Sequence, residues 1–402
     1  MLRIPLLRSL FSFFLAVFLC SGFTVAFGQM NRHADIKTGA ERFSEYLPLL
    51  KGKRVAVIIN QTAVIDSALL LDELIDSGVN VVKIFVPEHG FRGTADAGAR
   101  IKNEMDAATG LPVISLYGNN KKPGKAQLEN VDVLIYDLQD VGVRFYTYIS
   151  TLEYAMDACI ESKKQLLILD RPNPNGHLVD GPVLDTSLRS FVGMQPVPIV
   201  YGMTAGEYAK MLLGEKWIKN ASQLDLKIIP CKNYRHGRRY QLPVAPSPNL
   251  KTMAAIYLYP SLCFFEGTII SLGRGTDKPF QQWGHPDYNE KFNYSFVPKS
   301  VGGASKPLLE NQACFGELVA VEADSAYGLT HSQLNLSYLL KAYRLSPQKE
   351  KFFIPFFEKL AGTKVLRQQI IAGKSEAEIR TSWQPELDKF KKIRKKYLLY
   401  ED

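Results

Sequence analysis

The sequence predicts an α/β protein whose first part is a Rossmann-like, doubly wound, mostly parallel sheet, followed by a second, smaller α+β domain. Apolar runs rich in Val, Ile and Leu recur between residues 53 and 230 and alternate with helical segments. These runs do not alternate polar and apolar residues, which is typical of a parallel sheet buried by helices on both faces. Beyond residue 253 the pattern changes to glycine-rich loops and later helical segments.

The expected elements follow one another as strand and helix. R-V-A-V-I-I-N at 54–60 is the first strand, and the helix expected at 66–78 has a serine near its start and Gly78 at its end. T-A-G-E at 204–207 has the pattern of a capping box, which would begin another helix. Further strands are expected at 79–86, 112–118, 131–138, 166–170, 197–202 and 224–230, and helices at 147–161, 204–214, 332–343 and 350–360.

The N-terminus has the pattern of a secretory signal peptide. Arg3 and Arg8 accompany a long apolar run that ends in A-F-G, with Ala26 and Gly28 at the −3 and −1 positions of a cleavage site. An uncleaved membrane anchor is the alternative, since the run is about long enough to span a bilayer. We therefore expect a signal peptide at 1–28, a Rossmann-like domain at 30–253, a smaller α+β domain at 254–402, and a secreted or periplasmic protein without stable membrane insertion.

Charge and cysteine usage exclude several classes of protein. The formal net charge is +9, and much of the excess lies in K-F-K-K-I-R-K-K-Y at 389–397. We interpret this segment as a solvated amphipathic helix and expect no nucleic-acid partner, although a basic surface also suits an anionic polymer. The four cysteines beyond the signal form no C-x-x-C pair, so neither a zinc site nor a disulfide framework is indicated.

Polar residues accumulate where the expected strands end. In an open parallel sheet, ligands bind in the crevice outside the carboxyl ends of the strands. We therefore expect these polar residues to lie together in one cleft. They are Asn60 after the first strand, Glu88, His89 and Arg92 after the second, Asp137, Gln139 and Asp140 after the fourth, and Asn173, Asn175 and Tyr201 later in the chain.

The chemistry of this cleft suits a sugar. The chain has no dinucleotide or P-loop glycine motif, no G-x-S-x-G, no H-E-x-x-H and no histidines at metal spacing, so we expect neither a cofactor nor a metal. Carboxylates serve acid–base catalysis, while amides, arginines and tyrosines contact hydroxyl groups, acids and ring faces. A carboxyl group between Pro87 and His89 at a sheet edge can be desolvated, which favours its protonated form.

Structural roles are the alternatives for several of these residues. Glu88 would then cap a turn, and His89 would orient Glu88 rather than act as a base. Either Asp137 or Asp140 would pair with Arg144. Likewise, Asp170 would pair with Arg171, and Glu266 would end a strand instead of lining the cleft from the second domain.

Several long motifs together resemble one family. They are P-E-H-G-F-R-G, Y-D-L-Q-D-V-G-V-R-F-Y-T-Y, L-D-R-P-N-P-N-G, G-M-T-A-G-E, S-P-N-L, F-E-G-T and G-R-G-T-D-K-P-F. The chain resembles, from about residue 52 to its end, the secreted bacterial exo-β-N-acetylmuramidases, long catalogued as a domain of unknown function. The resemblance implies exolytic release of N-acetylmuramic acid from the non-reducing end of peptidoglycan fragments. It also implies that the proposed catalytic glutamate of the P-E-H-G motif is Glu88.

We expect Glu88 to act as general acid, with His89 and Asp137 in the catalytic set. The second group is Asp137, Asp140, Glu266 or the acetamido oxygen of the substrate. Arg92 or Arg144 would bind the lactyl carboxylate of muramic acid. The expected substrate contacts are Asn60, Arg92, Gln139, Asp140, Arg144, Tyr146, Asn173, Asn175, Tyr201, Glu266 and Arg274. The alternative function is a non-catalytic cell-wall glycan-binding protein, whereas an esterase or amidase lacks a nucleophile in these motifs.

Overall fold

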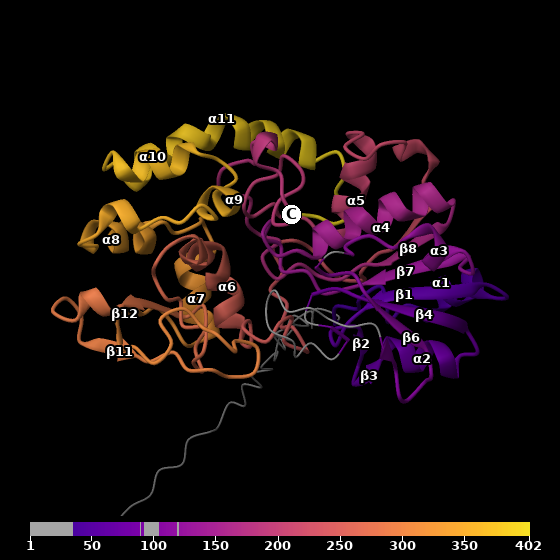
Figure 1. Ribbon diagram of the computed structural model, residues 1–402. Coiled ribbons are helices and arrows are strands. Elements are labelled where there is room, and N and C mark those ends of the chain that lie inside the picture. Colours follow the sequence, from indigo (N-terminus) through magenta and orange to yellow (C-terminus); the bar gives the residue numbers. More distant parts are fainter. Residues whose placement is uncertain (1–34, 89, 92–103, 119) are drawn as a thin grey trace, which may run out of the picture. The chain divides into compact units, whose positions relative to one another are not determined.

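The computed structural model describes residues 35–88, 90–91, 104–118 and 120–402 (Figure 1). Residues 36–402 form one compact unit. The predicted signal peptide at 1–28 lies outside the described residues, as do His89 and Arg92. In the described part of the chain, no helix has both the length and the apolarity needed to cross a membrane.

The central sheet has seven strands in the order β5-β6-β4-β1-β7-β8-β9 (Figure 1). All neighbouring strands run parallel except β5, which pairs antiparallel with β6 at one edge. The order reverses at β1, so the crevice outside the carboxyl ends of β1 and its neighbours is the expected ligand position. The strands are β1 (Arg54–Ile59), β4 (Asn80–Val86), β5 (Glu104–Met105), β6 (Pro112–Ser115), β7 (Val133–Asp137), β8 (Gln165–Leu169) and β9 (Leu226–Ile229).

Helices cover both faces of this sheet. Val55 and Val57 of β1 belong to one apolar cluster, and the intervening Ala56 and Ile58 belong to the other. Because successive strand residues point to opposite faces, both faces are buried and the predicted doubly wound α/β fold is confirmed. The first face is covered by α1 (Phe43–Leu50) and α2 (Leu70–Asp76), the second by α3 (Lys125–Leu128), α4 (Tyr148–Ser162) and α5 (Ala205–Gly214).

Two expected elements of the first part of the chain differ in the structure. The strand expected at 197–202 is wrong: Val200 makes only isolated bridges to Val143 and Asp180, and Pro198 lacks the N–H that a central strand needs. The helix expected at 66–78 begins only at Leu70, because a short hairpin of β2 (Val64–Ile65) and β3 (Ala68–Leu69) precedes it. By contrast, the capping box at 204–207 is confirmed, since Thr204 and Glu207 bond reciprocally at the start of α5.

The later part of the chain contains a separate antiparallel sheet in the order β10-β12-β11 together with several helices, as an α+β segment should. The expected helix at 350–360 is shorter than predicted and spans only Phe357–Ala361, beyond Pro355. The larger apolar cluster draws on helices before and after residue 253, so the domain boundary stays a prediction. The elements are α6 (Met253–Leu262), β10 (Gln282–His285), β11 (Tyr294–Phe296), β12 (Cys314–Leu318), α7 (Ala323–Thr330), α8 (Ser337–Leu345), α9 (Phe357–Ala361), α10 (Val365–Ile371) and α11 (Glu376–Arg394).

Short 3₁₀ helices complete the fold. They are η1 (Thr186–Leu188), η2 (Ala221–Gln223), η3 (Cys263–Gly267), η4 (Pro286–Tyr288) and η5 (Lys349–Lys351). Of these, η3 matters most for the site, because it follows α6 directly and carries Glu266.

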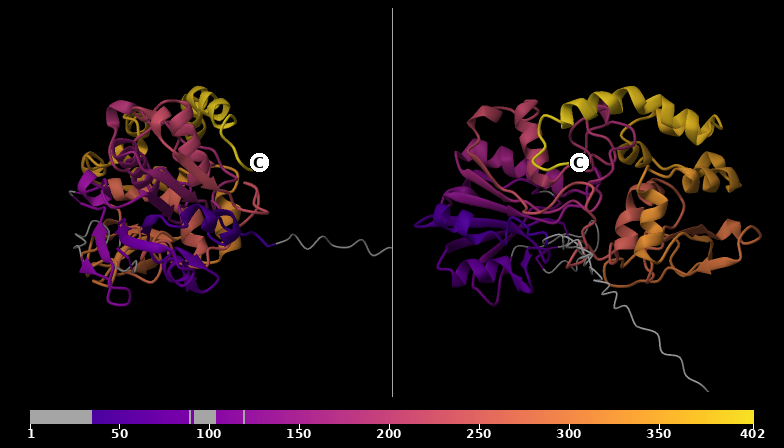
Figure 2. Two further views of the ribbon diagram at one scale, coloured as in Figure 1. Left: turned by 90° about the vertical axis from the view of Figure 1, so that its right-hand side faces the viewer. Right: turned by 180° about the vertical axis from the view of Figure 1, so that it is seen from behind.

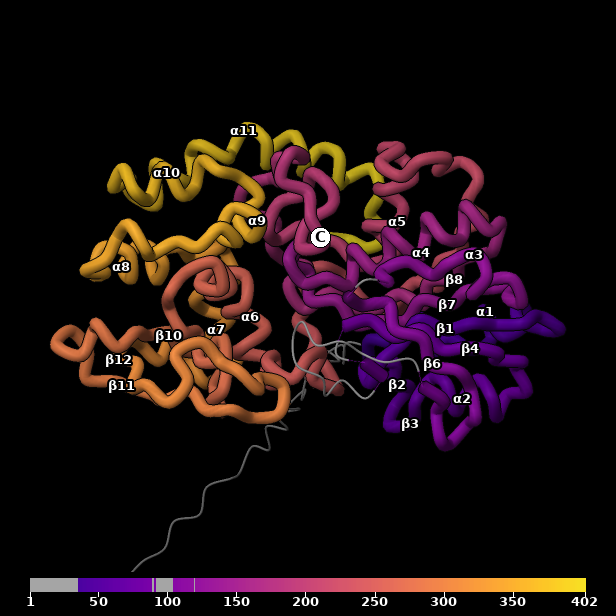
Figure 3. The backbone as a smooth tube through the Cα atoms, viewed as in Figure 1, coloured from indigo at the N-terminus to yellow at the C-terminus, as the bar shows by residue number. Residues whose placement is uncertain are grey.

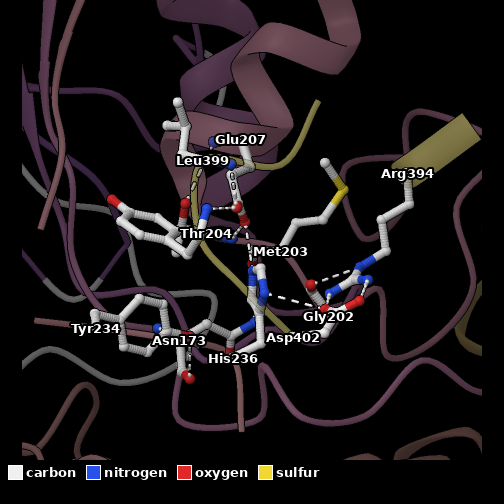
Figure 4. A network of polar contacts seen from close by, with 12 residues as sticks. Asn173, Gly202, Met203, Thr204, Glu207, Tyr234, His236, Arg394, Leu399 and Asp402 are labelled. Atoms are coloured by element: carbon white, nitrogen blue, oxygen red, sulfur yellow. Dashed lines mark hydrogen bonds and ion pairs between the residues drawn. The ribbon is translucent and has the colours of Figure 1, made fainter. Parts of the chain in front are cut away.

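The C-terminal tail returns to the sheet after α11, which runs from α10 back toward α5 (Figures 1, 2 and 3). Glu207 of α5 accepts the backbone N–H groups of Leu399 at 2.8 Å and Tyr400 at 3.2 Å, and its other oxygen lies 2.8 Å from Nε2 of His236 (Figure 4). The Tyr400 hydroxyl donates to Oδ2 of Asp170 at 2.6 Å. The end of the chain is therefore bonded to buried carboxylates at the carboxyl edge of the sheet.

We expect Tyr400→Phe to lower the free energy of unfolding by about 1–3 kcal/mol, because the fully buried Asp170 loses a donor and the N–H of Cys231 loses its acceptor. Tyr397→Phe is the matched control. Its hydroxyl donates to Glu215 at 2.6 Å, but that side chain is partly exposed and water can replace the lost bond, so we expect a loss below about 1 kcal/mol. Urea denaturation measures the free energy of unfolding of both variants. Equal losses of stability in the two variants would contradict the role given to Tyr400.

Candidate active site

A cavity of about 690 Å³ lies where residues that follow β4, β6 and β7 meet residues of the later segment. Its volume is that of a small-ligand site. The lining comprises Glu88, Tyr117, Gly118, Lys121, Phe145, Tyr146, Thr147, Tyr148, Phe191 and Val192 from the first part of the chain, and Ser247, Leu250, Tyr259, Glu266, Arg274, Phe280, residues 303–308 and Phe356 from later in the sequence.

Glu88 follows β4 directly and is half-buried. Its Oε2 accepts a hydrogen bond from Oγ1 of Thr147 at 3.2 Å. Thr147 occupies the N-cap position of α4, yet its side chain makes no capping bond to that helix. The hydroxyl of Thr147 is thus directed to the carboxylate, which fixes the position of Glu88 beside the first turn of α4.

Two tyrosines continue the same wall. The ring centroids of Tyr146 and Tyr148 lie 4.7 Å apart, and the Tyr146 hydroxyl donates to the carbonyl of Pro246 at 2.8 Å. Nδ2 of Asn60 donates to the Tyr148 hydroxyl at 2.6 Å, while the amide oxygen accepts from Thr62. Asn60, which was expected to contact substrate, is fully buried and supports the wall from behind.

The lining also includes a second carboxylate, which is paired with an arginine. Oε1 of Glu266 accepts from Arg274 Nε at 2.7 Å and Nη2 at 2.5 Å. The Arg274 guanidinium also lies 4.9 Å from the ring centroid of Phe280. Both Glu266 and Arg274 line the cavity, as expected from the sequence.

Asp137 does not line the cavity. Its two carboxylate oxygens receive Nε and Nη2 of Arg171 at 2.5 and 2.8 Å, and both side chains are at most 2% exposed. Burial raises the pKa of Asp137, and the neighbouring Arg171 opposes that shift. The suggested pair of Asp170 with Arg171 is therefore wrong: Arg171 pairs across the sheet, and Asp170 accepts from Thr204, Gly206 and Tyr400.

Arg144 also faces the protein interior. Nη1 donates to the carbonyls of Pro182 and Val197, and Nη2 donates to those of Leu360 and Ala361, all within 2.9 Å. The guanidinium is fully buried and makes no ion pair with Asp137 or Asp140, so that structural alternative is wrong. Its expected contact with a substrate carboxylate has no support in this geometry, because four backbone carbonyls already take the four terminal N–H groups and Arg144 is not among the lining residues.

The next polar residues are likewise bonded within the fold. Asp140 accepts from the N–H of Gly142 at 2.7 Å and from the Tyr201 hydroxyl, and burial raises the pKa of Asp140 to about 6. Nε2 of Gln139 donates to the carbonyls of Asp140 and Pro172. None of the three predicted contacts Gln139, Asp140 and Tyr201 belongs to the cavity lining.

Asn173 and Asn175 shape the turn after β8. Asn173 accepts the N–H of Asn175 at 2.8 Å and donates to the carbonyl of Met203 at 2.8 Å. Asn175 donates to the carbonyl of Val141 at 2.9 Å. Both side chains are at most 3% exposed and hold backbone groups rather than facing the cavity.

Several lining residues were not predicted. Thr147 and Tyr148 come directly after Tyr146, and Tyr117 and Lys121 follow β6. The rule that ligands bind beyond the carboxyl ends of parallel strands, applied to the expected strand at 112–118, would have found the last two. Across residues 35–88, 104–118 and 120–402, no three His, Cys, Asp or Glu side chains converge so as to hold a metal ion.

Comparisons with known proteins agree with this architecture. Residues 55–254 match the family model described as "Exo-beta-N-acetylmuramidase NamZ, N-terminal", and residues 257–400 match the C-terminal model of the same name. The chain is 36% identical over 392 residues to the peptidoglycan β-N-acetylmuramidase NamZ of Bacillus subtilis strain 168, covering 92% of this chain and 93% of that one.

Two solved structures from Bacteroides fragilis NCTC 9343, both of DUF1343 family proteins, share the fold. One is 48% identical with a TM-score of 0.84 and covers 92% of this chain and 100% of its own. The other is 28% identical with a TM-score of 0.74 and covers 91% and 99%. The resemblance drawn from the motifs is confirmed, and the chain belongs to the NamZ exo-β-N-acetylmuramidase family, a family of glycoside hydrolases.

Proposed function

We propose that this protein is an exo-acting glycoside hydrolase that releases N-acetylmuramic acid from the non-reducing end of peptidoglycan fragments, with Glu88 as general acid. The observation that carries the proposal is a half-buried glutamate in a sugar-sized cavity, held by Thr147 at the edge of the sheet where ligands bind. The name of the Bacillus subtilis relative supports the substrate class.

In this mechanism Glu88 protonates the glycosidic oxygen as the bond to the muramic acid residue breaks. Positive charge then develops at the anomeric carbon, and a second group must stabilise it or activate water. Of the groups expected for this role, Asp137 and Asp140 are not among the lining residues. Two candidates remain, namely Glu266, which lines the same cavity, and the acetamido oxygen of the substrate itself.

We also propose that the protein acts outside the cytoplasm, as a secreted or periplasmic enzyme on peptidoglycan-derived glycans. The proposal rests on the signal-peptide pattern at 1–28. N-terminal sequencing of the protein recovered from its host tests it. A mature chain that begins at Gln29 agrees with cleavage after Gly28, and retention of the segment in the membrane fraction contradicts it.

Glu88→Gln should lower kcat on a natural disaccharide of N-acetylmuramic acid and N-acetylglucosamine by about 10²–10⁴-fold, because the leaving oxygen loses its proton donor. The loss should be smaller on para-nitrophenyl N-acetylmuramide, whose leaving group departs without protonation. Mass analysis for free N-acetylmuramic acid measures the first reaction and absorbance the second. The exposed Glu129→Gln is the matched control.

Undiminished activity of Glu88→Gln on the disaccharide would refute the assignment of the general acid. A wild-type protein that binds the disaccharide without releasing either sugar would instead favour the non-catalytic glycan-binding alternative. The two outcomes are distinguishable, because the first leaves turnover intact and the second never shows it.

Thr147→Val should lower kcat on the disaccharide by about 10-fold while KM changes little, because Glu88 loses the donor that fixes its position. Thr147→Ser keeps the hydroxyl and should restore most of kcat. Steady-state kinetics of both variants provide the test. Equal losses in the valine and serine variants would show that Thr147 acts through packing and not through the hydrogen bond.

A further inference from the structure

The proposed substrate differs from N-acetylglucosamine by a lactyl ether, which carries a carboxylate. Three cationic side chains line the described part of the cavity, namely Lys121, Arg274 and Lys306. Arg274 already forms two contacts with Glu266. Among the described lining residues, the two lysines are therefore the cations left to bind an additional carboxylate. Neither lysine has a carboxylate within ion-pair distance in the described part of the chain.

Lys121 is the better placed of the two. It lies in the loop after β6, the strand that neighbours β4, and β4 leads directly to Glu88. Its Nζ rests 4.6 Å from the ring centroid of Phe191, and Tyr117 lies 6.2 Å from the same ring. This contact orients the ammonium group on an aromatic surface without neutralising its charge.

Burial separates Lys121 from Lys306. Lys121 is half-buried, whereas Lys306 is exposed. An ion pair in a partly desolvated position is stronger than one in open solvent, where water and salt screen the charges. Lys121 therefore offers the stronger site for a single carboxylate at the cavity wall.

We propose that Lys121 binds the lactyl carboxylate of N-acetylmuramic acid and is the residue by which this site distinguishes muramic acid from glucosamine derivatives. The inference rests on the proposed function, since it names the group that selects the proposed substrate. It assigns to Lys121 the role that the sequence suggested for Arg92 or Arg144.

The adjacent Lys122 provides a matched control. Its Nζ bonds to Oε1 of Glu161 at 2.8 Å, and it is not part of the cavity lining. Lys122→Met and Lys121→Met remove the same charge from neighbouring positions of one loop. Only Lys121→Met removes a cation from the cavity lining.

The test compares two substrates, para-nitrophenyl N-acetylmuramide and the same compound with its lactyl group as the methyl ester. The wild-type protein should prefer the free acid in kcat/KM by about 10-fold to 100-fold, since the ester has no charge to bind. Lys121→Met should hydrolyse the two compounds at nearly equal rates, and Lys122→Met should retain the preference. Equal melting temperatures of the two variants show that folding is intact.

An unchanged preference for the acid in Lys121→Met overturns the inference while leaving the hydrolase intact. A preference lost in Lys306→Met or Arg92→Met but kept in Lys121→Met overturns it as well and assigns the carboxylate to that residue. If the wild-type protein hydrolyses neither compound nor the natural disaccharide, the proposed function fails instead.

Discussion

The buried ion pair of Asp137 with Arg171 is the contact on which the geometry of the site depends. It joins the carboxyl ends of β7 and β8, and Nη2 of Arg171 also donates to the carbonyl of Val64 beyond β1 at 3.1 Å. Three segments at the edge of the sheet are thereby held together. A charge buried without its partner would cost several kcal/mol, so this edge is held in a single arrangement. Thr147 lies in the segment that follows Asp137, and its hydroxyl donates to Glu88 beyond β4.

The same physical requirement explains why so few of the polar residues at this edge face the cavity. A buried polar group must be hydrogen-bonded, and loops that cross the end of a sheet bury many carbonyl and N–H groups. Arg144 satisfies four carbonyls, and Asn173 and Asn175 satisfy further backbone groups. These residues are buried and bonded within the fold, and none of them lines the cavity. The polar groups that remain for a ligand are those of the lining residues, such as Glu88 and Thr147.

The fold was predictable because its signals are local, whereas the site depended on pairings between strands. Continuous apolar runs predicted six of the seven sheet strands and missed β5, which has only two residues and no such run. The run at 197–202 predicted a further strand that does not form, because Pro198 lacks the N–H that a central strand needs. The pairing of Arg171 with Asp137 rather than with the adjacent Asp170 follows only from β7 lying beside β8. The sequence order predicts which residues lie at the edge of the sheet. Which of these side chains face the cavity depends on the residues that lie next to them in the folded structure. The position of Glu88 between Pro87 and His89 after the second strand singled it out as a candidate, and the family resemblance then implied its catalytic role.

The charges of the lining residues limit which ligands the cavity can bind. The described lining carries the acidic Glu88 and Glu266 and three cations, with Glu266 neutralised by Arg274. The lining also carries Lys121 and Lys306, and neither has a carboxylate partner among the described residues. A neutral sugar would leave these two lysines without such a partner. An anionic sugar brings a carboxylate that can pair with these lysines, and it thereby supplies the counter-charge that the described lining lacks.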